Sequence, residues 1–64
     1  MEHRYIPVNI IKTEYSKHYT VKGYINSMYI SHIEPYSSDK YGEDCTAITM
    51  SNGSIIFITE NLFV

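Results

Sequence analysis

The sequence has one cysteine, no tryptophan, two prolines and three glycines, and these shortages narrow what a 64-residue chain can be. With Cys45 alone, no intramolecular disulfide can form, and no set of cysteines and histidines has zinc-finger spacing. So short a chain buries only about 60% of the surface its unfolded form exposes, which leaves its stability thin. The sequence therefore predicts one domain over residues 1–64 that self-associates, with no metal site and no cofactor.

Long apolar runs are also missing. No stretch approaches the roughly 18 apolar residues of a membrane span, and the N-terminus leads into no signal-peptide core. Hydrophobic residues make up 44% of the chain and charged residues 19%, which is typical of a folded protein. We therefore expect a cytoplasmic protein with no membrane partner.

The charges are divided unevenly along the chain, whose net charge is −2. Four of the five basic residues lie within residues 1–22, and five of the seven acidic residues follow them. A negative net charge disfavours general nucleic-acid binding, because phosphate contacts need Lys and Arg. The bipolar pattern allows the two halves to pair internally, or head to tail with a second copy.

Hydrophobic residues recur with a period of two, which indicates β-strands. The clearest pair, residues 45–50 and 55–59, flanks Asn52-Gly53, which is typical of a type I′ hairpin turn. This turn places Met50 opposite Ile55. The face predicted for the core carries Ile48, Met50, Ile55 and Phe57. The opposite face carries Ala47, Thr49, Ile56 and Ile58. A hairpin that is apolar on both faces is either central in a barrel or covered by a partner.

Further β-rich runs precede this hairpin. In order, we expect a strand over residues 6–13, a turn near 16–18, a return strand over 19–24, one short helical turn near 25–29 and a strand over 29–34. The polar stretch 37–44 is the longest gap between elements, so it is the expected mobile or binding loop.

Five short strands predict a mostly β fold: a small antiparallel five-stranded barrel or bent sheet, of SH3-like or OB-like size, with one short helical turn. A two-layer dimer of bent sheets is the alternative. The apolar end, Leu62-Phe63-Val64, is expected to dock on the fold or on a neighbour. The residues predicted for self-association are Ile56, Ile58, Leu62 and Phe63.

Reactive groups are few. His32-Ile33-Glu34 places a His and a Glu on one strand face, but the cysteine partners of a zinc deaminase are missing and no nucleophile accompanies the pair. A solvated pair is the better interpretation. Cys45 follows Glu43 and Asp44, whose charges disfavour the thiolate, so we expect a structural cysteine. No catalytic residue is assigned, and the protein is predicted not to be an enzyme.

Seven tyrosines are the main surplus. Tyrosine supplies large, rigid, amphipathic contact area at interfaces, although strand propensity also accounts for it. The candidate residues for binding a partner or ligand are Tyr15, Lys17, His18, Tyr19, Lys22, Tyr36 and Tyr41. The five that lie between residues 15 and 22 form a basic and aromatic cluster that suits a phosphate, but no glycine-rich phosphate loop accompanies it. A solvated hairpin turn is the alternative.

The pattern from Tyr24 onward resembles the short flagellar FlbD-like proteins and many small proteins encoded by bacteriophages. The similar residues are Tyr24-Ile25-Asn26, Ile30, Ile33-Glu34-Pro35, Thr46-Ala47-Ile48, Asn52-Gly53, Ile56 and Glu60. The likeness covers rather more than half of the chain, which departs from the FlbD-like pattern in its N-terminal strand, its 37–44 loop and its lack of a following acidic helix. The resemblance implies a compact bacterial or phage accessory protein, with a phage origin preferred; a phage-encoded protein would act in the host cytoplasm.

Together these features predict a non-enzymatic small binding protein, a homo-oligomer that binds and inhibits a host protein through a Tyr-rich surface. One alternative is a protein that sequesters a nucleotide-type signalling molecule between subunits, using Arg4, Lys17, Lys22 and tyrosines. A second alternative is a nucleic-acid-binding β-barrel, which the acidic second half ranks lower.

Overall fold

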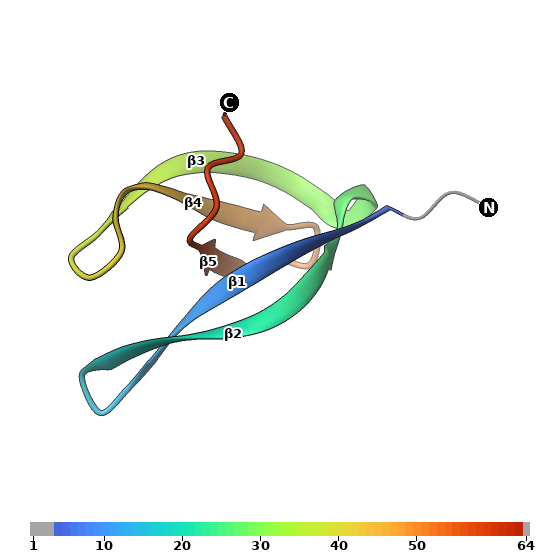
Figure 1. Cartoon of the computed structure of the whole chain (residues 1–64). Helices are drawn as coiled ribbons and strands as arrows, with labels where there is room; N and C mark the ends of the chain where they lie inside the picture. Colours follow the sequence, from blue (N-terminus) through green and yellow to red (C-terminus); the bar gives the residue numbers. More distant parts are fainter. Residues whose placement is uncertain (1–3, 64) are drawn as a thin grey trace.

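The computed structural model describes residues 4–63. Its elements are β1 (Tyr5–Glu14), β2 (Lys17–Asn26), the 3-10 helix η1 (Ser27–Tyr29), β3 (Ile30–Ser38), β4 (Gly42–Met50) and β5 (Ile55–Ile58) (Figure 1). All five strands pair antiparallel in one sheet, in the order β2-β1-β5-β4-β3. The predicted mostly β fold of five antiparallel strands is confirmed, and so is the short helical turn.

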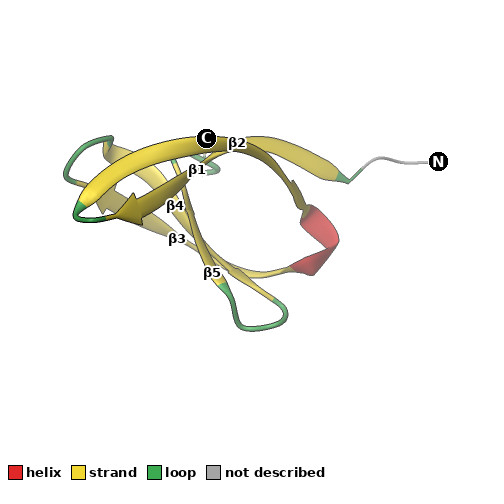
Figure 2. Ribbon diagram, turned by 90° about the horizontal axis from the view of Figure 1, so that it is seen from below, coloured by secondary structure: helices red, strands yellow, loops and turns green. Residues whose placement is uncertain are grey.

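The sheet is curved but open (Figure 2). β2 and β3 follow one another in the chain, yet they form the two opposite edges of the sheet, and η1 carries the chain from one edge to the other. The side-chain oxygen of Asn26 caps η1 by accepting a hydrogen bond from the Met28 backbone N–H at 3.0 Å. Because β2 and β3 are not paired, the barrel form of the prediction is wrong.

One side of the sheet carries the core. Val8, Ile25, Ile48 and Ile58 are buried together, from four different elements of the sheet, β1, β2, β4 and β5. Partly buried apolar side chains pack around them: Ile6, Ile10, Ile30, Ile33, Met50, Ile56 and Leu62. Because side chains alternate along a strand, the residues between these positions face the other side of the sheet.

The hairpin of β4 and β5 closes with a turn different from the predicted one. The Gly53 N–H donates to the Met50 carbonyl at 2.9 Å, and the Met50 N–H donates to the Ser54 carbonyl at 2.8 Å. Gly53 has a φ of 92°, but Asn52 is not among the positive-φ residues of the described chain. This is a type I turn followed by a glycine bulge, which holds one residue more than a type I′ turn.

The extra residue shifts the register by one. Ile55 lies opposite Thr49, Ile56 opposite Ile48 and Ile58 opposite Thr46, so the predicted pairing of Ile55 with Met50 is wrong. A shift of one residue exchanges the two faces of a strand. The side chains of β5 that were expected outside are therefore inside, and those expected inside are outside.

This exchange corrects the predicted self-association residues. Ile58 is fully buried in the chain's own core, so it is not available to a second copy. Ile56 and Leu62 also pack against the core. Phe63 is the exposed member of the set, at 49%. On the other side of β5, Ile55 and Phe57 leave the predicted core, and Ile55 is 60% exposed.

The turn of the first hairpin also differs from expectation. It consists of Tyr15 and Ser16, with φ values of 51° and 65°, and it places Glu14 opposite Lys17. The observed turn therefore lies nearer the N-terminus than the predicted residues 16–18, and β2 begins two residues earlier than expected. Within residues 4–63, no helix is long and apolar enough to cross a membrane.

Replacing Gly53 with Ala should lower the free energy of unfolding by about 1–2 kcal/mol, because the left-handed backbone there strains any residue with a Cβ. The added methyl itself has open space, so the effect is one of conformation. Urea denaturation measures the change. Ala at Ser51 is the matched control and is expected to have little effect, since its φ is not positive. Equal losses in both variants would contradict the glycine-bulge turn.

Candidate binding surface

The side of the sheet opposite the core carries an apolar patch over β3, β4 and β5. This patch, called here the platform, consists of Tyr36, Ala47, Ile55 and Phe57. The rings of Tyr36 and Phe57 contact each other, with centroids 4.5 Å apart and planes tilted by 38°. Ile55 lies beside them, 60% exposed. Together with Glu34, Pro35 and Thr49, these side chains line a cavity of about 310 Å³.

An ionisable pair stands at the rim of the platform. Nε2 of His32 lies 2.8 Å from Oε1 of Glu34, and both side chains are exposed. Alternation along β3 puts them on the same side as Tyr36. The predicted solvated pair on one strand face is therefore confirmed.

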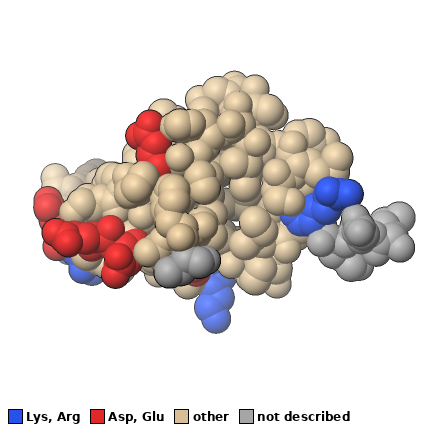
Figure 3. Space-filling view, turned by 90° about the horizontal axis from the view of Figure 1, so that it is seen from above, with Lys and Arg blue, Asp and Glu red and all other residues tan. Residues whose placement is uncertain are grey.

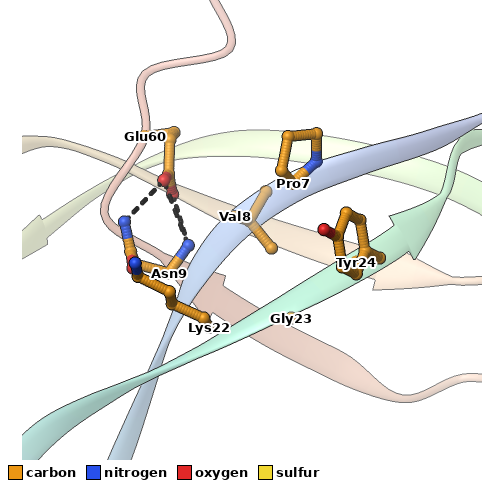
Figure 4. Close-up of a pocket in the computed structure, with 7 residues that line it drawn as sticks. All are labelled: Pro7, Val8, Asn9, Lys22, Gly23, Tyr24 and Glu60. Carbon is orange, nitrogen blue, oxygen red and sulfur yellow. Dashed lines mark hydrogen bonds between the residues drawn. The ribbon is translucent and has the colours of Figure 1, made fainter.

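The same side of β1 and β2 carries a second group of exposed side chains, called here the tyrosine face: Tyr5, Pro7, Lys22 and Tyr24. Tyr24 lies opposite Pro7 and is 73% exposed, and Tyr5 is 59% exposed. A cavity of about 330 Å³ opens here, and Asn9 and Glu60 also line it (Figure 4). Some of the seven tyrosines therefore lie at exposed positions.

Glu60 is the acidic side chain that lines this cavity, and Lys22 is the basic one. The Glu60 carboxylate accepts hydrogen bonds from the Asn9 backbone N–H at 3.0 Å and from Asn9 Nδ2 at 2.9 Å (Figure 4). It thereby fastens the segment after β5 to β1. A carboxylate in the wall also repels phosphate, so the cavity beside Lys22 suits a nucleotide poorly.

The basic and aromatic cluster predicted at the first hairpin does not form one site. Strand alternation places His18 and Lys22 on one side of the sheet and Lys17 and Tyr19 on the other. Tyr15 lies at the turn and is 90% exposed. Residues that are close in sequence are therefore divided between two faces.

Lys40 joins the ends of the two long hairpins. Its Nζ donates to the His18 carbonyl at 2.7 Å and lies 5.5 Å from the centroid of the Tyr41 ring. It thereby brings two predicted binding residues near one another. Lys40 is not itself a predicted binding residue, and it is the one Lys or Arg after residue 22. The predicted loop 37–44 is mostly strand, since only residues 39–41 lie between β3 and β4.

The same two hairpins differ in the charges that they carry. The β3–β4 hairpin carries Asp39, Glu43 and Asp44, and acidic side chains gather at one end of the molecule (Figure 3). Lys17 and Lys22 form no ion pair within the part of the chain that the structure describes. Arg4 and Lys17 lie at opposite ends of the first hairpin, roughly 30 Å apart along β1. One subunit therefore does not gather the predicted nucleotide-binding cations.

Cys45 is a free cysteine and is buried. Its thiol faces the Gly42 and Tyr41 carbonyls at 3.7 and 3.9 Å. Burial raises the pKa of the Cys45 thiol, and the carboxylates of Asp44 and Glu60 raise it further. Within residues 4–63, no three His, Cys, Asp or Glu side chains cluster closely enough to hold a metal ion.

Compared with known proteins, the chain matches no family model, no curated protein and no solved structure. Its similarity to FlbD-like and small phage proteins therefore stays a prediction from the sequence. The platform and the tyrosine face are identified from the exposure, contacts and charge of their own residues.

Proposed function

We propose that this chain is a non-enzymatic binding protein that forms a homo-oligomer through the platform and binds a protein partner with its first hairpin. The observation that carries the proposal is the exposure of Ile55 beside the Tyr36–Phe57 pair, on the side of the sheet that the core leaves bare. The outer face of an antiparallel sheet is usually polar. An aliphatic and aromatic patch there is typical of an interaction surface.

A second copy of the chain is the partner that best suits the platform. Two-fold interfaces bring the same patch of each subunit together, so an unbalanced charge would meet itself. The platform itself consists of uncharged side chains, and the Glu34 carboxylate at its rim has a polar partner in Nε2 of His32, 2.8 Å away. Covering it would also supply apolar burial that a 64-residue chain without a disulfide lacks. The phage origin, the host target and the cytoplasmic setting belong to this proposal and rest on the sequence alone.

Replacing Ile55 with Lys should convert the oligomer to a monomer, because the interface would bury an unpaired ammonium group. Folding should be little affected, since the side chain is 60% exposed in the single chain. Sedimentation equilibrium over a range of concentrations measures the result. Tyr15→Lys is the matched control: it adds the same charge at an exposed ring on the hairpin turn, and it should leave the oligomer intact.

Two outcomes would contradict the proposal. A wild-type chain that remains monomeric at the highest soluble concentration would remove self-association. An Ile55→Lys variant that assembles as the wild type does would place the interface elsewhere.

A further inference from the structure

The two edges of the sheet are protected to different degrees. β3 contains Pro35, and its pairing with β4 is irregular between Ile30 and His32 and between Tyr36 and Ser38. Proline and bulges are features that keep an edge strand from pairing with another chain. β2 has neither, since its residues pair with β1 in one unbroken register from Lys17 to Asn26. β2 therefore presents a long, regular edge.

The backbone groups on this edge can be assigned. The His18 carbonyl points away from β1, since it accepts the hydrogen bond from Lys40. In a strand paired antiparallel, the N–H and C=O groups of every second residue point to the same edge. Thr20, Lys22 and Tyr24 therefore present theirs on the edge where His18 does. No other strand of the described chain pairs with this edge.

The side chains along β2 define what fits beside it. On one side stands Lys22, which makes no ion pair among the described residues. On the other side stand Tyr19 and Val21, each 43% exposed. Opposite charges and apolar pairs across neighbouring strands each stabilise pairing by about 0.2–1 kcal/mol. A complementary strand would thus place carboxylates on the Lys22 side and apolar side chains on the Val21 side.

Charge also selects between a second copy and a different partner. β2 carries Lys17 and Lys22 and no acidic residue. Pairing two β2 strands would bring two ammonium groups to each side of the seam, and like charges opposite one another destabilise strand pairing. We propose that the β2 edge binds an extended segment of a partner protein, with alternating acidic and apolar residues, as a sixth strand of the sheet. This inference rests on the proposed partner binding and gives its chemistry.

A seven-residue peptide of alternating Val and Glu, capped at both ends and labelled with fluorescein, provides the probe. Its carboxylates lie on one face and its valines on the other, so it matches both sides of β2. Fluorescence anisotropy should show binding to the wild type and none for the peptide in which Lys replaces Glu. Lys22→Glu should weaken binding about tenfold or more, because attraction becomes repulsion. Lys12→Glu is the control on β1, away from the edge, and should change affinity less than threefold.

A proline tests the backbone contacts separately. Thr20→Pro removes an N–H that points to the free edge, not one that bonds to β1, so the hairpin should still form. It is expected to abolish peptide binding, whereas Thr20→Ala, which keeps the N–H, should bind as the wild type does. Circular dichroism and thermal melting verify that both variants fold. If Thr20→Pro fails to fold, the comparison of Lys22→Glu with Lys12→Glu decides the matter alone.

The outcomes separate the two proposals. Failure of the peptide to bind a wild type whose assembly depends on Ile55 overturns the edge inference and leaves the platform proposal standing. Loss of self-assembly in Thr20→Pro shows a second copy on the edge and also overturns the inference. Binding of a twelve-residue thymidine oligonucleotide that Lys22→Glu abolishes and Thr20→Pro does not would identify a phosphate contact in place of an added strand.

Discussion

Replacing Ile58 with Ala should lower the free energy of unfolding by about 2–5 kcal/mol, because truncating a fully buried isoleucine loses apolar contact and leaves a cavity. Ile58 is 0% exposed and lies between Ile10 on β1 and Thr46 on β4. A chain of this length has a total stability of about 3–10 kcal/mol. The variant should therefore unfold at a much lower urea concentration than the wild type, which urea titration followed by far-UV circular dichroism would show.

Ile55→Ala is the matched control, since the two isoleucines stand three residues apart on one short strand. Its loss should stay below about 1 kcal/mol at monomer concentrations, because surface substitutions have small effects. The comparison tests the register of β4 and β5 directly. If Ile55→Ala costs more than Ile58→Ala, the strand is in the register of a type I′ turn.

Replacing Thr46 with Val should lower the free energy of unfolding by about 1–3 kcal/mol, although the two side chains have nearly the same shape. Oγ1 of the fully buried Thr46 donates to the Glu60 carbonyl at 2.7 Å and accepts from the Leu62 N–H at 3.2 Å. Valine leaves both backbone groups without these partners, and buried polar groups without partners are costly. The segment after β5 should loosen as a result.

Hydrogen exchange of the Leu62 amide, measured by NMR together with urea denaturation, tests this expectation. The Leu62 N–H should exchange faster in Thr46→Val. The amides of β1 should keep the same ranking of exchange rates as in the wild type. Thr49→Val is the control, because Thr49 lies on β4 with its side chain on the platform side. An unchanged Leu62 exchange rate in Thr46→Val would contradict the role given to its hydroxyl.

The strands of this protein could be predicted from the sequence, whereas the register of its last hairpin could not. Alternation and Asn52-Gly53 correctly indicated a hairpin, but that dipeptide suits both a type I′ turn and a type I turn with a glycine bulge. The hydrophobic pattern usually decides such a case, because one face is polar. Here both faces of β5 are apolar, so Ile55 and Ile58 were each placed on the wrong side.

Two further features could not be predicted for a related reason: whether the sheet closes, and which candidate residues share one face. Nothing in the alternation of β2 and β3 says whether these two strands pair, and Pro35 with two irregularities in β3 marks an edge only once the strand order is known. The sequence predicts one surface for the cluster of residues 15–22, but neighbouring residues in a strand face opposite sides of the sheet. Tyr36 is one of the aromatic candidates that the sequence predicts, but its contact with Phe57 depends on the register.

An isotope-filtered NOE experiment on a mixture of ¹³C-labelled and unlabelled chains tests most directly whether the bare face of the sheet meets its own copy. Cross-peaks between chains should link the Ile55 methyl groups to the rings of Tyr36 or Phe57. A complete absence of cross-peaks between chains at concentrations near the solubility limit, or cross-peaks confined to β2, would contradict the account.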